Sequence, residues 1–142
     1  MIRAVLDTNI LVSTLIKKEG KPYQIITQAR TKYEWLTSEF ILKETRRVVA
    51  RKHIQTRYPN RVTPSRTNNF LKYVKVAAEA VNVKTKVLAV VQDLNDDPIV
   101  ACAVDGRAHY LVTGDPHLLM LKSFRGIQIV TPAQFLEILK KE

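Results

Sequence analysis

The stretch IRAVLDTN, residues 2–9, decides the fold class because a short, mostly apolar run ends abruptly at an acid. Residues 2–6 have the length and composition of a buried β-strand. Asp7 stops this run, and helical periodicity follows from residue 8 to residue 17. A buried strand followed directly by a helix is typical of α/β folds.

The same alternation continues to the end of the chain. A mostly parallel sheet, covered by helices on both faces, is the architecture that such an alternation favours. We see no internal repeat or linker, so residues 1–142 are expected to form a single domain. Further strands are predicted at residues 33–37, 86–91, 109–113 and 127–130, and further helices at 22–30, 38–53, 63–81, 96–106, from 115 and from 131.

Length and composition narrow the class of protein. The chain has 142 residues, of which 46% are hydrophobic, enough for one well-packed core. Its one cysteine, Cys102, permits no internal disulfide and fits a reducing compartment, so we expect a cytoplasmic protein. The apolar run that Asp7 stops is too short for a signal peptide, and no apolar stretch approaches the ~20 residues of a membrane span.

The formal net charge of +10 is concentrated in one part of the chain. Between residues 43 and 75 there are ten Lys and Arg residues against one acid, Glu44, which gives this window a charge of +9. Such a surface attracts polyanions and raises their encounter rate. The alternative is a solvated helical face without a partner, and the charge pattern alone leaves both open.

Four acids occupy positions that a parallel sheet brings together. Asp7 and Asp115 directly follow predicted strands, and Asp96 begins the helix after another. Ligands of open α/β sheets bind beyond the carboxyl ends of the strands. Glu44 lies on the apolar face of the helix at residues 38–53, which points toward the sheet. An ion pair with a neighbouring Arg or Lys is the alternative explanation for Glu44.

A hard divalent cation would relieve the repulsion between these four carboxylates. Magnesium and manganese prefer oxygen ligands, and such ions activate water and stabilise phosphoryl-transfer transition states. The three histidines, at positions 53, 109 and 117, lack the spacing of a zinc site. Cys102 lies among apolar residues and is expected to be a core residue rather than a nucleophile.

Four short motifs together resemble the PIN-domain family. They are Asp7-Thr8-Asn9, the segment ILKE at residues 41–44, the segment DLNDDPI at 93–99 followed by Ala101 and Ala103, and the segment YLVTGD at 110–115. Each motif alone is weak, but their order and spacing cover nearly the whole chain. The nearest branch is the small prokaryotic, VapC-like branch, described as toxins of toxin–antitoxin pairs.

The resemblance implies a three-layer α/β/α sandwich and a Mg²⁺- or Mn²⁺-dependent endoribonuclease. The acidic positions that bind metal and act in catalysis in this family match Asp7, Glu44, Asp96 and Asp115. The family's supporting polar positions match Asn9 and Thr113. Asp97 lies beside Asp96, so either could be the third ligand. Asp96 is preferred because Ile99 and Ala103 then fall three and seven residues on, as in the family pattern.

The resemblance also implies partners. RNA is the expected substrate, and we expect phosphate-binding residues among Arg46, Arg47, Arg51 and Lys52, which follow Glu44. A cognate antitoxin is expected to insert an arginine into the acidic cleft, and a homodimer is expected from the apolar positions at 22–30 and 63–81. A housekeeping RNA-processing nuclease and a non-catalytic RNA-binding or interaction module are the alternatives. The second would be expected to have lost one or more acids.

Overall fold

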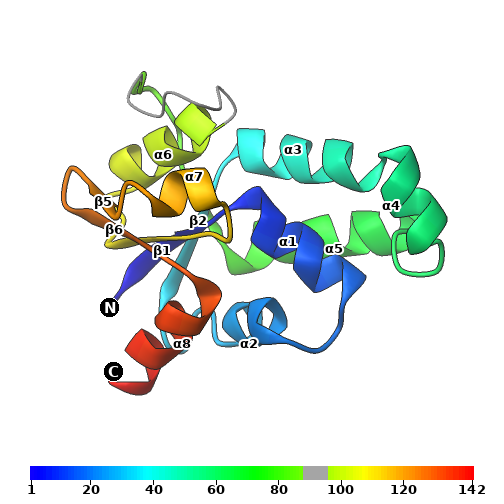
Figure 1. The fold of residues 1–142 in the computed structure, drawn as a ribbon, viewed down its shortest axis with the longest axis horizontal. Helices are drawn as coiled ribbons and strands as arrows, with labels where there is room; N and C mark the ends of the chain where they lie inside the picture. Colours follow the sequence, from blue (N-terminus) through cyan, green and yellow to red (C-terminus); the bar gives the residue numbers. More distant parts are fainter. Residues whose placement is uncertain (88–95) are drawn as a thin grey trace.

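The computed structural model describes residues 1–87 and 96–142, with the backbone alone for residues 96 and 97. Within these residues, six strands form one sheet in the order β3-β2-β1-β4-β6-β5 (Figure 1). Every neighbouring pair is parallel except β5 and β6. The strands are β1 (Arg3–Leu6), β2 (Glu34–Thr37), β3 (Glu79–Ala80), β4 (Tyr110–Val112), β5 (Ser123–Phe124) and β6 (Ile127–Val130).

Helices cover both faces of this sheet, as the sequence predicts (Figure 1). α6 packs against β1, β2 and β4, while α1 packs against α2, α3 and α5, and α2 packs against α8. No helix of the described chain is long and apolar enough to cross a membrane. The helices are α1 (Thr8–Ile16), α2 (Lys21–Thr27), α3 (Glu39–Val49), α4 (Lys52–Arg57), α5 (Pro64–Ala77), α6 (Asp96–Asp105), α7 (Pro116–Leu119) and α8 (Pro132–Lys140).

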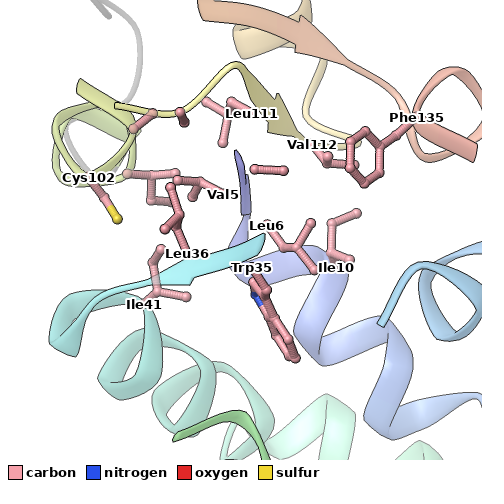
Figure 2. Close-up of a cluster of buried hydrophobic side chains, with 14 of the residues drawn as sticks. Val5, Leu6, Ile10, Trp35, Leu36, Ile41, Cys102, Leu111, Val112 and Phe135 are labelled. Carbon is pink, nitrogen blue, oxygen red and sulfur yellow. The ribbon is translucent and has the colours of Figure 1, made fainter. Parts of the chain in front are cut away.

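The core lies on both faces of the sheet because consecutive strand residues point to opposite sides. Val5 and Leu36 are register partners on β1 and β2, and they point toward Cys102 of α6 (Figure 2). Leu6 and Trp35 point the other way, toward α1 (Figure 2). All five side chains are buried. β1 is therefore apolar on both faces, which explains why the run before Asp7 shows no polar alternation.

The predicted elements differ from the observed ones in four places. The helix expected at 22–30 ends at Thr27. The helix expected at 38–53 is divided into α3 and α4, because the chain turns at residues 50 and 51. The helix expected at 63–81 ends at Ala77, and β3 follows it. The strand expected at 86–91 lies mostly outside the described residues, and residues 86 and 87 are not in a strand.

β3 and β5 could not be predicted because each has only two residues. Both residues of β3 are exposed, so its sequence has neither an apolar run nor an apolar alternation. It is held instead by parallel pairing with the edge of β2, in register with Leu36 and Thr37. This pairing is a tertiary effect that local pattern cannot show.

Replacing Gly106 by alanine is expected to destabilise the fold by about 1–3 kcal/mol, the usual cost of overpacking a core. A Cβ at this position would lie 2.9 Å from the carbonyl oxygen of Cys102 and 3.0 Å from side-chain atoms of Leu36 and Val81. Urea denaturation would measure the loss. Gly114→Ala is the matched control, since the nearest atom to its Cβ is 3.9 Å away. Equal stability of the two variants would contradict the prediction.

Candidate active site

Asp7 ends β1 and caps the N-terminus of α1. Its Oδ1 accepts a hydrogen bond from the backbone N–H of Thr8 at 2.7 Å, and its Oδ2 accepts one from the hydroxyl of Thr113 at 2.6 Å. The residue is only 4% exposed. An aspartate is a favoured N-cap, and the positive end of the helix dipole stabilises its charge. The same residue that stops the strand therefore starts the helix and holds a fixed carboxylate.

Asp115 repeats this arrangement after the neighbouring strand, β4. Its Oδ1 accepts a hydrogen bond from the backbone N–H of His117 at 2.9 Å, so Asp115 caps α7. The hydroxyl of Thr113, which donates to Asp7, also accepts a hydrogen bond from the N–H of Asp115 at 3.0 Å. One fully buried threonine thus connects the strand ends that carry the two acids.

Glu44 reaches the same region from α3. Its side chain is 14% exposed and forms a two-pronged ion pair with Arg47, one turn along the helix. One of these hydrogen bonds, from Nε of Arg47 to Oε2, measures 3.2 Å. The ion pair considered as an alternative for Glu44 is therefore present, and it coexists with an inward position of the carboxylate.

A pocket of about 310 Å³ brings three of the four predicted acids together. It lies between the N-terminal half of α1 and the C-terminal half of α3, where the carboxyl ends of β1 and β4 meet. The described residues that line it include the three acids and two arginines. They are Asp7, Thr8, Asn9, Val12, Ser13, Glu44, Arg47, Val48, Arg51, Ile99 and Asp115.

The four basic residues expected to bind phosphate do not all lie at the pocket. Arg47 and Arg51 line the pocket beside the acids. Arg46 turns toward α5 instead, where it donates a hydrogen bond to Oδ1 of Asn68 at 2.7 Å. Lys52 is exposed at the start of α4 and does not line the pocket.

The third acidic position falls where the structure describes only the backbone. Asp96 and Asp97 begin α6, and their side chains lie outside the described residues. Ile99, which lines the pocket, follows Asp96 by three residues, so the start of α6 lies within about one turn of the pocket. The choice between Asp96 and Asp97 stays a prediction.

The chemistry of the pocket suits a hard divalent cation. The donors that line it are carboxylates, an amide and hydroxyls, which magnesium and manganese prefer. No His or Cys is among its described lining residues, which does not fit zinc. Among the described side chains there is no group of three or more His, Cys, Asp or Glu that could hold a metal ion.

Two lining residues with hydroxyl groups were not predicted to belong to the site. Thr8 and Ser13 contribute hydroxyl-bearing side chains to the pocket from α1. Ser13 could have been found from helical spacing, because it lies four residues after Asn9 and so on the same face. Thr8 is buried, and no hydrogen bond is found for its hydroxyl oxygen in the described structure.

Cys102 and His109 have structural roles, whereas His117 lies beside Asp115. Cys102 is fully buried, and burial raises the pKa of its thiol to about 12, which confirms that it is a core residue. Nδ1 of His109 accepts a hydrogen bond from the backbone N–H of Arg3 at 2.9 Å. His117 is half exposed, with Nδ1 3.6 Å from Oδ1 of Asp115.

Comparison with solved structures shows the same fold in two assemblies. One is VapBC2 from Rickettsia felis bound to a DNA fragment from their promoter, with a TM-score of 0.63 and 17% identity over 92% of this chain and 98% of that chain. The other is DNA-bound VapBC from Salmonella typhimurium, with a TM-score of 0.62 and 18% identity over 93% of this chain and 99% of that chain. At these identities the likeness concerns the fold alone.

Comparison of sequences identifies the family. No curated protein sequence matches the chain. A family model described as the PIN domain matches residues 3–117, which include Asp7, Glu44 and Asp115. This match confirms the resemblance of the four motifs. Because it covers well over half of the chain, the protein belongs to the PIN-domain family.

Proposed function

We propose that this protein is a metal-dependent endoribonuclease that hydrolyses RNA phosphodiester bonds with Mg²⁺ or Mn²⁺. The observation that supports it best is the convergence of Asp7, Glu44 and Asp115 in one pocket of a PIN-domain chain, with two arginines at the same pocket. Acids hold a hard cation and arginines hold phosphate, so the pocket combines both requirements of phosphoryl transfer.

Each residue has a role in this proposal. When bound, a divalent cation activates water and stabilises the charge of the reacting phosphoryl group. Asp7 and Asp115 would hold it, together with Asp96 or Asp97 from the start of α6. Thr113 fixes the orientation of the Asp7 carboxylate through its hydrogen bond.

Glu44 and Asn9 complete the proposed site. Glu44 is available to the cation only when Arg47 releases it, and an RNA phosphate is a suitable competing partner for that arginine. Asn9 lines the pocket beside Asp7 and supplies an amide that can hold water or substrate.

The direct test is incubation of purified protein with a panel of structured and unstructured RNAs, with Mg²⁺, with Mn²⁺ and with a chelator. We expect cleavage that requires the metal and yields defined internal products. Cleavage that persists in the chelator would reject the metal, and intact RNA under all conditions would reject the nuclease.

Replacing Arg51 by glutamine is expected to flatten the salt dependence of affinity for an unstructured RNA by about 0.7 in the slope of log K against log salt. The reason is that each phosphate contact releases counterions. Affinity is measured in the presence of a chelator, which prevents metal-dependent cleavage of the RNA. Lys52→Gln is the control, because Lys52 is the next residue, carries the same charge and does not line the pocket. Equal slopes for both variants would mean that the pocket arginine does not hold phosphate.

We further propose that the protein is the toxin component of a toxin–antitoxin pair. The two similar structures, both named VapBC, support this. An arginine from the cognate antitoxin would pair with Asp7 or Asp96 and so compete with the metal. A homodimer stays a prediction. Several of the apolar positions that motivated it, including Ile25, Ile26 and Val74, are buried within one chain, so they are not available to an interface.

A further inference from the structure

We propose that a second groove, between α1, α2 and α5, binds a single-stranded segment of RNA that leads into the acidic pocket. This inference rests on the proposed function, and it assigns part of the substrate to a surface outside that pocket. The groove has a volume of about 580 Å³ and shares only the helix α1 with the acidic pocket.

Three cations line this groove, and no acid is among its described lining residues. Two of the three are held in place through the backbone. Nε of Arg61 donates a hydrogen bond to the carbonyl oxygen of Ile16 at 3.0 Å, and Nε of Arg66 donates one to the carbonyl oxygen of Arg61 at 3.1 Å. Lys18 is the third cation, and it is exposed. Among the described residues no hydrogen bond is found for the terminal nitrogens of either arginine, so these nitrogens can meet an incoming anion.

Aromatic rings line the same groove. Tyr23 of α2 is 37% exposed and Tyr73 of α5 is 47% exposed, and the half-buried Phe70 also lines the groove. The ring of Tyr73 is tilted against that of the buried Trp35, with ring centroids 6.4 Å apart. Exposed rings beside clustered cations are the combination by which proteins bind single strands, since bases stack on the rings and phosphates meet the cations.

The groove is within reach of the acidic pocket. Thr8 and Asn9 line the pocket near the start of α1, whereas Thr14 and Leu15 line the groove near its end. The two linings meet on this helix, because Ser13 lines the pocket and the next residue, Thr14, lines the groove. One strand of RNA could therefore contact both surfaces within a few nucleotides.

Charge favours RNA over a second copy of this chain as the occupant of the groove. A second copy of this chain would also carry a net charge of +10, and its own groove would bring three more cations to the contact. Like charges that meet at an interface oppose association. A flexible polyanion with flat apolar bases satisfies both the cations and the rings.

The test is fluorescence anisotropy with a short, unstructured, labelled oligoribonucleotide in a chelator, at several salt concentrations. We expect the double variant Lys18→Gln, Arg66→Gln to lower the salt slope by about 1.4, since each contact with a single strand contributes about 0.7. The charge-matched control is Lys72→Gln, Lys75→Gln, which removes two exposed cations of α5 that do not line the groove. An equal reduction in both proteins would overturn the proposal.

The rings are tested separately. Tyr73→Leu should weaken RNA binding by about fivefold or more, the loss of one stacked base, whereas Tyr73→Phe keeps the ring and should bind like wild type. Because Tyr73 also contacts Trp35, thermal melts must accompany this pair. Tyr23→Leu repeats the test on α2 and should also weaken binding. Unchanged affinity in both leucine variants would overturn the stacking contact.

Two further results would assign the groove to a protein. If light scattering shows a wild-type dimer that becomes a monomer in Tyr23→Leu, the groove is an interface between copies. If the groove variants bind RNA normally but lose a cognate protein partner, it is a partner site. The proposed nuclease can fail independently: RNA binding that depends on the groove, in a protein that cleaves no RNA with metal, would keep this inference and reject the activity.

Discussion

Replacing Asp7 by asparagine is expected to reduce metal-dependent RNA cleavage by more than about a hundredfold. Changing residues that only support metal ligands typically costs 10- to 100-fold, and a ligand itself should cost more. The substitution removes a negative charge at the place where the end of β1, the start of α1 and the Thr113 hydroxyl converge. The measurement is the initial rate of RNA cleavage at saturating Mg²⁺.

The metal-free Asp7→Asn protein is expected to be about as stable as wild type. Asparagine is as good an N-cap as aspartate, so Oδ1 can still accept from the N–H of Thr8. Removal of one charge also relieves repulsion among the pocket acids. Mg²⁺ should raise the melting temperature of wild type but not of the variant, because only a protein that binds the ion is stabilised by it.

Two controls make this result specific. Glu137→Gln removes one negative charge from an exposed side chain of α8 and should leave cleavage unchanged. Asp7→Ala removes the cap as well as the charge and should lose about 1 kcal/mol of stability even without metal. If Asp7→Asn melts well below wild type in a chelator, Asp7 is a structural residue and the assignment to the metal is wrong.

The positions of Asp7 and Asp115 could be predicted from two rules. A carboxylate directly after a buried strand caps the next helix, and parallel strands end at one edge of the sheet. The first rule acts over a few residues, and the second applies because the alternation of strands and helices predicts a parallel sheet. The inward position of Glu44 also followed from helical spacing, but its pairing partner did not. Whether Arg46 or Arg47 meets Glu44 depends on side-chain direction and on α5, which offers Asn68 to Arg46.

Features assembled from several helices could not be predicted. The basic window from residue 43 to residue 75 includes Arg51 at the acidic pocket, Arg61 and Arg66 at the second groove and Arg46 against α5. Sequence gives the total charge of this window but not the direction of each side chain. The groove also needs Lys18 and Tyr23 from outside the window. Its composition is therefore visible only after α1, α2 and α5 are packed together.

Replacing Phe135 by alanine is expected to destabilise the fold by about 3–5 kcal/mol, the usual loss for a large aromatic side chain in a core. Phe135 is fully buried and lies edge-on to Tyr33, with ring centroids 5.1 Å apart, and tilted against Tyr110 at 5.8 Å. It connects α8 to the face of the sheet that carries α1 and α2 (Figure 2). The residue lies beyond residues 3–117, which the family model matches.

Urea denaturation of the metal-free protein would measure this loss. Two further variants test whether the loss depends on the burial and on the ring of Phe135. Phe40→Ala removes the same side chain from a half-buried position at the start of α3, so a clearly smaller loss is expected there. Phe135→Leu restores apolar volume without the ring and should fall between wild type and Phe135→Ala. A loss below about 1 kcal/mol for Phe135→Ala would show that α8 is not part of the cooperative core. A loss in the expected range means that the PIN fold of this chain depends on its last helix, because removing one side chain of α8 then costs a large part of the total stability of a small domain.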